Sequence, residues 1–516
     1  MEKHLSVLLS LSCFMFLTMI LRLLYSIWWK PKMIEKCQKG QGIHGPPYRL
    51  FYGNFKEMSK MAKEAASKPM KCTHDVMPRL DPFLQKNMLI YGKLFVIWLG
   101  IAPRVVVMEP KLIKEILNDK SGDFEKPQIH PLKTLFVTGL ASYDGEKWAK
   151  YRKIINPAFH IEKLKGMLPA FSICCDEMIE KWEKLVGLEG SCELDVSLEF
   201  QKLTADAISR AAFGSSFEQG RQIFQLQKEQ CKLYMDSYYM TAYPWLSFLP
   251  NRTKARMREI HKEVQVLLKG IIQKRENAIK RGNSIKDDLL GLLLESNLAE
   301  LRENEGLKGN GMTIEEVMEE CKLFYFAGQE TTADLLSWTI IALSMHSDWQ
   351  EQAREEVLKL VGKSSPSFDE LAQLKIVTMI LQEVLRLYPP AFPTRSTHRR
   401  TKLGEFFLPA GVQIYLPSYL IHRDPELFGE DVLEFNPRRF SEGVWKASKD
   451  QNSYFPFGGG PRNCIGQNFA MLEAKMALAM ILQHFSFEMS PSYAHAPALP
   501  ITLKPLYGAQ VIVHKL

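Results

Sequence analysis

The order of apolar and polar residues changes character several times along the chain, and each change predicts a different kind of element. The longest apolar run extends from Leu5 to Trp29 and contains Arg22 as its single charged residue. About 20 apolar residues are enough to cross a lipid bilayer as a helix. The pattern therefore predicts a membrane anchor over residues 1–30, with a buried core helix as the alternative interpretation.

The charges around this run predict its orientation. One lysine, Lys3, precedes the run, and four follow it closely: Lys30, Lys32, Lys36 and Lys39. Because positive residues stay on the cytosolic side of a membrane, we expect the rest of the protein in the cytosol. The absence of a clear small-residue cleavage site favours a retained, single-pass anchor. We interpret residues 31–60 as a basic, Pro/Gly-rich linker and residues 61–516 as the main domain.

The body of the chain is mainly helical in pattern. Two β-rich runs, Leu94–Gly100 and Pro103–Pro110, predict a hairpin. Helical periodicity then dominates as far as Met345, and short strands and turns return after Gly411. One helix has the apolar series Met257, Ile260, Val264, Leu267 and Ile271 and many basic residues, which indicates a solvated face rather than a docking surface. We expect a mainly α fold with a small β region.

The longest predicted helix begins at Thr313, which forms a capping box with Glu316, and continues to about Met345. It is apolar on nearly every side, so it must pass through the core. Its centre is interrupted by Gly328, Gln329, Glu330, Thr331 and Thr332. Such a centre offers either a niche for a small ligand and water or merely a kink where helices cross.

One short stretch, FPFGGGPRNCIG from Phe455 to Gly466, carries a candidate for chemistry. Its glycines permit a tight turn, and helical periodicity starts directly after Cys464. Free amide groups and the positive end of a helix dipole favour a thiolate at such a position. The stretch therefore predicts a sulfur anion presented at the start of a helix.

Composition narrows the class of protein. The 516 residues are 46% hydrophobic and 24% charged, as in ordinary globular proteins. The net charge of +8 fits a location near anionic lipid or an acidic partner, and no module for nucleic acid is present in the sequence. The nine cysteines are odd in number, irregularly spaced and without a CxxC pair. They indicate a reducing compartment with mostly inert thiols.

Two groups of residues are candidates for ion pairs. Glu383 and Arg386 lie one helical turn apart, and Arg439 is expected to complete a buried network with them, which we assign to folding. Trp148 and Arg152 also lie one turn apart. Together with Arg462 and Arg395 they suit a site for anionic groups.

In combination, these motifs resemble the cytochrome P-450 family over nearly the whole chain. The family signature Phe-x-x-Gly-x-Arg-x-Cys-x-Gly is matched by Phe457, Gly460, Arg462, Cys464 and Gly466. The stretches WAKYR, AGQETT, EVLR and FNPRRF follow in the family's order. The stretches GPPYRLFYGN, DGEKWAKYRKIINPAFH and LPAGVQI are similar to the plant seventy-two clan of membrane-bound microsomal enzymes.

The resemblance implies a fold and a cofactor site. The long helix would lie over a haem b group, and the helix after the cysteine loop would lie beneath it. Cys464 would be the axial thiolate ligand of the iron, which favours O–O cleavage. The residues implied in cofactor binding are Phe457, Arg462, Arg395, Trp148, Arg152 and Gly328. Glu330 and Thr331 match the acid–alcohol pair that relays protons, and Glu383, Arg386 and Arg439 match the family's structural triad.

The resemblance also implies an activity. It indicates a monooxygenase of the endoplasmic reticulum membrane, facing the cytosol, that uses O2 and electrons from NADPH. The electrons would come through a separate flavoprotein reductase, because the chain has no nucleotide-binding fingerprint. The alternatives are a haem-thiolate isomerase or dehydratase that needs no reductase, which the intact AGQETT opposes, and a non-catalytic membrane haem protein.

The substrate is expected to be a bulky apolar terpenoid, triterpenoid or related plant hormone. By analogy with the family, three segments line its pocket: Asp123–Thr138, Ser237–Phe248 and Ala391–Thr394. Within the last, Ala391, Phe392 and Thr394 are the named pocket residues. The exact substrate, the position oxidised and the oligomeric state lie beyond the sequence.

Overall fold

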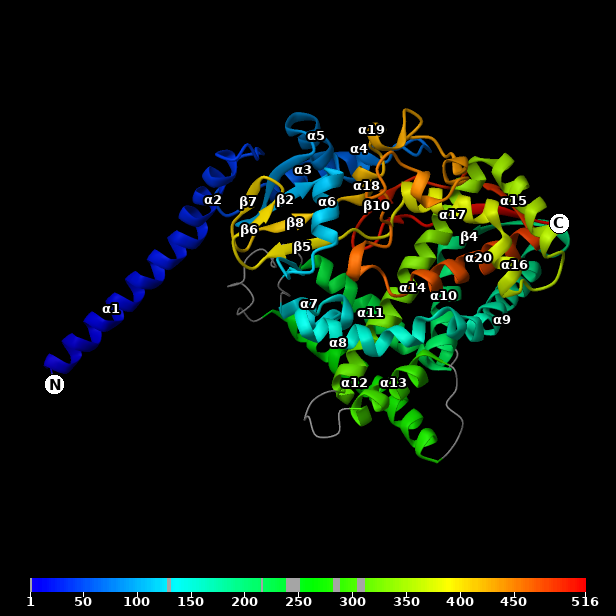
Figure 1. The fold of residues 1–516 in the computed structure, drawn as a ribbon, viewed down its shortest axis with the longest axis horizontal. Helices are drawn as coiled ribbons and strands as arrows, with labels where there is room; N and C mark the ends of the chain where they lie inside the picture. Colours follow the sequence, from blue (N-terminus) through cyan, green and yellow to red (C-terminus); the bar gives the residue numbers. More distant parts are fainter. Residues whose placement is uncertain (1, 128–130, 215–216, 238–250, 282–287, 304–310) are drawn as a thin grey trace.

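The computed structural model describes residues 2–127, 131–214, 217–237, 251–281, 288–303 and 311–516. Figure 1 shows a largely helical body with strands along one side, from which the N-terminal helix projects. The predicted mainly α fold with a small β region is confirmed.

The helices run in chain order as follows: α1 Glu2–Leu24, α2 Lys30–Lys39, α3 Phe55–Ala66, α4 Met77–Leu80, α5 Pro82–Tyr91, α6 Pro110–Leu117, α7 Pro131–Phe136, α8 Gly145–Ile155, α9 Ile161–Val186, α10 Val196–Phe213, α11 Phe217–Asp236, α12 Arg252–Lys280, α13 Leu289–Glu303, α14 Ile314–Met345, α15 Ser347–Leu360, α16 Phe368–Gln373, α17 Lys375–Leu387, α18 Ser418–Ile421, α19 Pro425–Phe428 and α20 Gln467–His484. The strands are β1 Leu94–Leu99, β2 Ala102–Val107, β3 Phe124–Glu125, β4 Ser191–Asp195, β5 Thr394–Thr397, β6 Thr401–Leu403, β7 Phe406–Leu408, β8 Gln413–Tyr415, β9 Phe485–Met489, β10 Pro497–Ala498, β11 Lys504–Pro505 and β12 Gln510–Lys515.

The N-terminal helix is continuous with the body. A stretch of π-helix, Tyr25–Trp29, joins α1 to α2, and the resulting helix is long and apolar enough to cross a membrane. Its body end is held by aromatic contacts: the buried Tyr48 hydroxyl donates to the carbonyl of Ile27, and the Tyr48 ring lies edge-on to Trp98 at 4.9 Å. Ile34 of α2 packs into the same cluster. The start of the predicted linker is thus a helix bound to the body.

The strands form a small main sheet of order β1-β2-β8-β5-β3. The predicted hairpin is present, with Leu94 of β1 opposite Val107 of β2. β2 is parallel to β8, whereas β5 is antiparallel to β8, so the segment after α17 returns to the sheet beside the hairpin. A second sheet has the order β4-β12-β9, and two-stranded pairs are formed by β6 with β7 and by β10 with β11.

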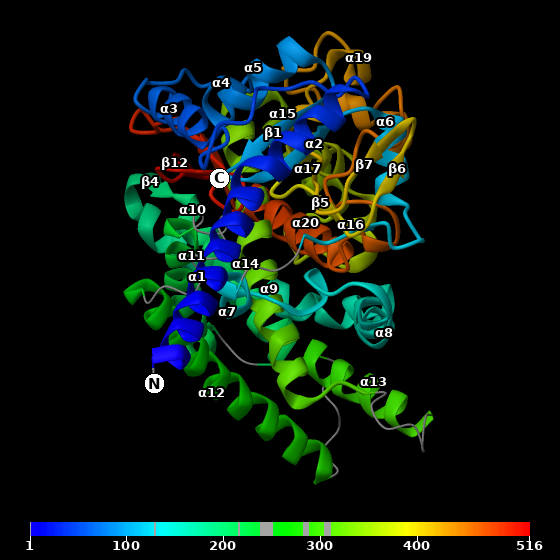
Figure 2. The ribbon, with the colours of Figure 1, turned by 90° about the vertical axis from the view of Figure 1, so that its left-hand side faces the viewer.

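The largest hydrophobic core surrounds α14, which crosses the middle of the helical body next to α10, α12, α17 and α20 (Figure 2). Its predicted capping box is present between Thr313 and Glu316. In α12 the predicted apolar stripe faces the core, with Met257, Ile260 and Val264 fully buried. The basic side chain of Arg256 on the same helix pairs at the surface with Glu229 of α11.

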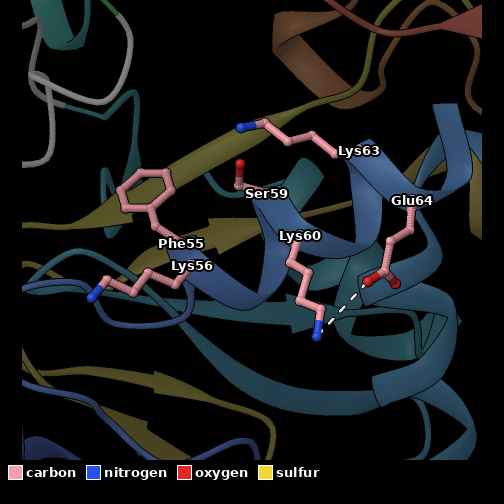
Figure 3. Close-up of a pocket in the computed structure, with 6 residues that line it drawn as sticks. All are labelled: Phe55, Lys56, Ser59, Lys60, Lys63 and Glu64. Carbon is pink, nitrogen blue, oxygen red and sulfur yellow. Dashed lines mark ion pairs between the residues drawn. The ribbon is translucent and has the colours of Figure 1, made fainter. Parts of the chain in front are cut away.

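A shallow surface pocket lies on α3 near the linker (Figure 3). Its walls come from one helix, and Lys60 pairs there with Glu64 at 3.8 Å. The pocket contains no side chain from the cysteine loop or from α14, which carry the candidate active-site residues.

Candidate active site

The cysteine loop is shaped by close contact with α6. Gly460 has φ +63°, and a Cβ atom built on it would lie 2.0 Å from the carbonyl oxygen of Leu117. Only glycine fits such an approach. The backbone N–H of Cys464 donates to the carbonyl of Phe457 at 2.8 Å, and α20 begins after Gly466. The prediction that Cys464 precedes a helix start is confirmed.

The Cys464 side chain reaches solvent although protein surrounds it on most sides. Burial raises the pKa of its thiol, while the backbone N–H of Gly466 and the guanidinium of Arg152 act in the opposite direction. In the part of the chain that the structure describes, no group of three or more His, Cys, Asp or Glu side chains is arranged to hold a metal ion. A single cysteine sulfur that solvent can reach fits the axial ligand of a haem iron, which binds it as the thiolate.

Three cations converge near this loop: Arg395, which is buried, and Lys126 and Arg462, which are partly buried. Burial lowers the pKa of Lys126 to about 7, and the neighbouring Arg395 and Arg462 add to the shift. Burial and Arg462 likewise lower the pKa of Arg395 to about 10. Asp144, which pairs with Arg462, offsets part of this charge. Arg462 has a carboxylate partner in Asp144, and three cations lie close to one another, so the donor set fits an anionic group such as the two carboxylates of haem.

Lys126 was not identified from the sequence. It lies in the predicted pocket segment Asp123–Thr138, where a lysine with no motif around it gives no signal of its own. The cation that could have pointed to it, Arg395, lies more than 260 residues further along the chain. The antiparallel pairing of β3 with β5, in which Glu125 lies opposite Ser396, brings the two segments together.

The predicted pair on α8 also reaches the cysteine loop. The Arg462 guanidinium stacks over the Trp148 ring at 4.4 Å. Arg152 donates to the backbone carbonyl and side-chain oxygen of Asn463 at 2.9 and 3.0 Å. Trp148, Arg152 and Arg462 are therefore brought together around Cys464, and their roles toward haem remain predictions.

The middle of α14 has the irregular contacts that its sequence indicates. The Thr331 hydroxyl donates to the carbonyl of Ala327 at 2.7 Å. Thr204 of α10 donates to the carbonyl of Gln329 at 2.9 Å. A Cβ atom at Gly328 would lie 2.9 Å from the Ile208 side chain of α10, so the close approach of two helices explains this glycine. Its place among the cofactor-binding residues stays a prediction.

The expected structural network is formed, with Glu383 and Arg386 fully buried and Arg439 partly buried. The Arg386 guanidinium makes two hydrogen bonds to the Glu383 carboxylate, of 2.8 and 2.7 Å. It also donates to the backbone carbonyls of His422 and Val432. Arg439 lies 3.7 Å from the same carboxylate. This geometry ties α17 to the chain that leads into the cysteine loop.

An apolar cluster lies beside the middle of α14. The Phe136 ring of α7 contacts Phe326 of α14 at 4.8 Å and Tyr234 of α11 at 5.9 Å, and Ile501 packs on the same cluster. Phe136 was expected in the pocket, whereas Tyr234, Phe326 and Ile501 were not, because they lie outside the three segments. Residues 238–248 of the second segment are outside the described residues.

The third predicted pocket segment, Ala391–Thr394, runs alongside the main sheet. Phe392 packs edge-on against Tyr415 and Tyr419, on the side of the second hydrophobic core. Ala391 is exposed, and the carbonyl of Thr394 accepts a hydrogen bond from Arg395. Phe392 thus packs against residues of the sheet region, whereas Phe136 and Phe326 belong to the helices α7 and α14.

Glu320 of α14 anchors the segment that leads to Asp144. Its carboxylate accepts from the backbone N–H of Leu140 at 3.0 Å, and burial raises its pKa to about 8. Because the pKa is higher in the folded than in the unfolded protein, this carboxyl stabilises the fold at low pH. That contribution is lost as the pH rises from about 4.5 through about 8.

We therefore expect Glu320→Gln to gain stability over the wild type as the pH is raised. The difference in unfolding free energy should grow by up to about 1.4 kcal/mol per pH unit between the two pKa values. Melting temperatures of the two proteins at pH 6, 7, 8 and 9 measure it. Glu315→Gln, at an exposed position of the same helix, is the control. Parallel pH profiles for Glu320→Gln and wild type would contradict the prediction.

A single accessible cysteine before a helix start, a group of neighbouring cations and a long interrupted helix fit a haem-thiolate protein. The sequence profile of the cytochrome P450 family matches residues 75–507. The chain therefore belongs to the cytochrome P450 family.

Its relatives are similar over nearly their whole length. Cytochrome P450 CYP72A616 of Paris polyphylla is 54% identical over 492 residues, which cover 95% of both chains. The 11-oxo-beta-amyrin 30-oxidase of Glycyrrhiza uralensis is 52% identical, with 95% of this chain and 94% of the relative covered. Secologanin synthase 1 of Catharanthus roseus is 50% identical, with 96% and 95% covered. The resemblance to the plant seventy-two clan is confirmed, and the protein is a haem-dependent monooxygenase.

Proposed function

We propose that the protein oxidises a bulky apolar terpenoid, with electrons from NADPH delivered by a separate flavoprotein reductase. It acts from the endoplasmic reticulum membrane, with α1 as a single-pass anchor and residues 61–516 in the cytosol. The observation that carries the substrate class is the apolar cluster of Phe136, Tyr234, Phe326 and Ile501 beside Glu330. The relative named for β-amyrin, a triterpene, supports it.

The residues around the site divide into four roles. Cys464 would hold the haem iron, and Lys126, Arg395 and Arg462 would neutralise the haem carboxylates. Bound haem and O2 supply the oxygen atom that enters the substrate. The apolar cluster excludes water and orients the substrate, and Thr331 and Glu330 would move protons from solvent to the site.

The proposal is tested by incubating the full-length protein, in membranes with a plant reductase and NADPH, with a panel of triterpenoids, monoterpenoids, fatty acids and small aromatics. We expect a product that is one oxygen atom heavier from a terpenoid, and none when the reductase is omitted. Better turnover of fatty acids or small aromatics than of every terpenoid would overturn the substrate class. Product without reductase would favour the isomerase or dehydratase alternative.

We expect Thr331→Ala to bind substrate normally but to release most of the NADPH electrons as hydrogen peroxide. A proton relay contributes roughly a hundredfold to ten-thousandfold in rate, so product formation should fall within this range. The measurement is product and peroxide formed per NADPH consumed. Ser337→Ala is the matched control, because its hydroxyl makes the same bond to the carbonyl four residues earlier on α14, at 2.7 Å. Tight coupling in Thr331→Ala would leave helix bending as the role of this residue.

Replacing Phe392 by alanine should change the product profile while haem content stays normal. Phe326→Ala, on the opposite side, should have the same kind of effect because it opens the apolar cluster next to α14. Product ratios from one terpenoid substrate measure both variants, with the exposed Trp445→Ala as control. An unchanged product profile in Phe392→Ala, with only lower stability, would remove this residue from the pocket.

A further inference from the structure

The middle of α14 binds one particular segment of chain, residues 502–504, on three successive turns. Glu330, Asp334 and Trp338 are spaced four residues apart and therefore lie on one face of the helix. Glu330 lies 3.7 Å from the Lys504 ammonium group. Asp334 hydrogen-bonds to the Thr502 hydroxyl, and the Trp338 ring nitrogen donates to the carbonyl of Leu503 at 2.9 Å. The face thus holds the segment by one contact per turn.

The contact between α14 and residues 502–504 contains one ion pair, between Glu330 and Lys504. Asp334 is almost completely buried, and burial together with the nearby Glu330 raises its pKa well above the ordinary value, which favours its neutral form. The Lys504 cation is therefore left to balance Glu330. The pair is partly shielded, with exposed fractions of 14% for the Glu330 side chain and 31% for Lys504.

The same segment also borders the substrate side of the site. Ile501, the residue before Thr502, packs on the apolar cluster of Phe136 and Phe326. On α11, burial raises the pKa of the Cys231 thiol to about 11, and the Glu330 carboxylate adds to the shift, which places Glu330 close to this cluster. The N–H of Leu503 donates to the carbonyl of Pro390, next to the predicted pocket residues. A short stretch of backbone thus connects Ile501, in the wall of the proposed pocket, to Lys504, the partner of Glu330.

We propose that Lys504 is a positioning residue for Glu330. The contacts of Asp334 and Trp338 fix the backbone of residues 502–504. The Lys504 ammonium group then holds the Glu330 carboxylate in one orientation at the edge of the substrate pocket. A carboxylate that relays protons must occupy the same place in every turnover, because small displacements of a catalytic group are costly in rate. The inference rests on the proposed proton relay of Glu330 and Thr331 and names what holds the relay in place.

The decisive variant is Lys504→Met, which keeps the length of the side chain and removes its charge. We expect product formed per NADPH to fall by roughly three- to tenfold, a fraction of the full relay contribution. The substrate-induced spectral shift should give an unchanged dissociation constant. Lys504→Arg should restore coupling, because a cation is retained. Lys515→Met is the matched control: it removes an ion pair with Glu183 from β12, away from α14.

Hydrogen exchange, which needs no catalytic turnover, separates a role of Lys504 in positioning Glu330 from a role in the stability of residues 501–506. Because Asp334 and Trp338 still hold the segment in Lys504→Met, hydrogen exchange of the amides of residues 501–506 should match that of the wild type. If Lys504→Met fails to bind haem, Lys504→Gln replaces it, with the same expected loss of coupling. Wild-type coupling in both uncharged variants would overturn the inference, as would a failure of Lys504→Arg to restore it. Absence of product from the wild type would instead overturn the proposed function.

Discussion

We expect Cys464→His to lose monooxygenation completely and to change the carbon-monoxide spectrum of the reduced protein to that of an imidazole-ligated haem. The sulfur is the donor that the cysteine loop presents on its accessible side, and the backbone of the loop is fixed by the contact of Gly460 with Leu117. Imidazole is a neutral ligand and cannot donate the electron density that a thiolate donates. The loop therefore keeps its shape while its chemistry changes.

The measurement needs two controls. Cys37→Ser, at an exposed position of α2, should keep the thiolate-type spectrum and full activity. Haem content should be measured by a method that is independent of the axial ligand, so that loss of haem is not mistaken for a change of ligand. A thiolate-type spectrum in Cys464→His would show that another cysteine binds the iron.

Arg386→Ala should be the most destabilising single substitution in the body. It would leave the Glu383 carboxylate buried without its main partner and would remove hydrogen bonds to the carbonyls of His422 and Val432. Breaking a buried ion pair from one side costs about 3–5 kcal/mol. Because the network fixes the approach to the cysteine loop, we expect protein with little haem, measured by absorbance and by denaturant unfolding.

A surface arginine gives the comparison. Arg256→Ala removes the ion pair with Glu229. Both side chains are about 40% exposed, so the substitution should destabilise the protein far less than Arg386→Ala. Equal effects of the two substitutions would contradict the assignment of Arg386 to a buried network. So would normal haem incorporation in Arg386→Ala.

The elements that could be predicted from the sequence are those that are determined by residues close together in the chain. The cysteine loop follows from glycines beside a helix start, α14 from its capping box and long apolar pattern, and the Glu383–Arg386 pair from one-turn spacing. Contacts between segments that lie far apart in the chain leave no comparable pattern in the sequence. Lys126 meets Arg395 through the β3–β5 pairing, and Ile501 reaches Phe136 only because α14 binds the segment that follows it. The close approach of Gly328 to Ile208, on another helix, also had no signal in the sequence.

The attachment of the N-terminal helix to Tyr48 and Trp98 makes it a rigid strut rather than a tether. A helix rises 1.5 Å and turns about 100° with each residue. Inserting residues before Ile27 would therefore change the height of the body above the bilayer in fixed steps and rotate the membrane-embedded part relative to it. A flexible tether would absorb such insertions without effect. If α1 spans the membrane as proposed, the length of this strut sets how far the body stands from the bilayer.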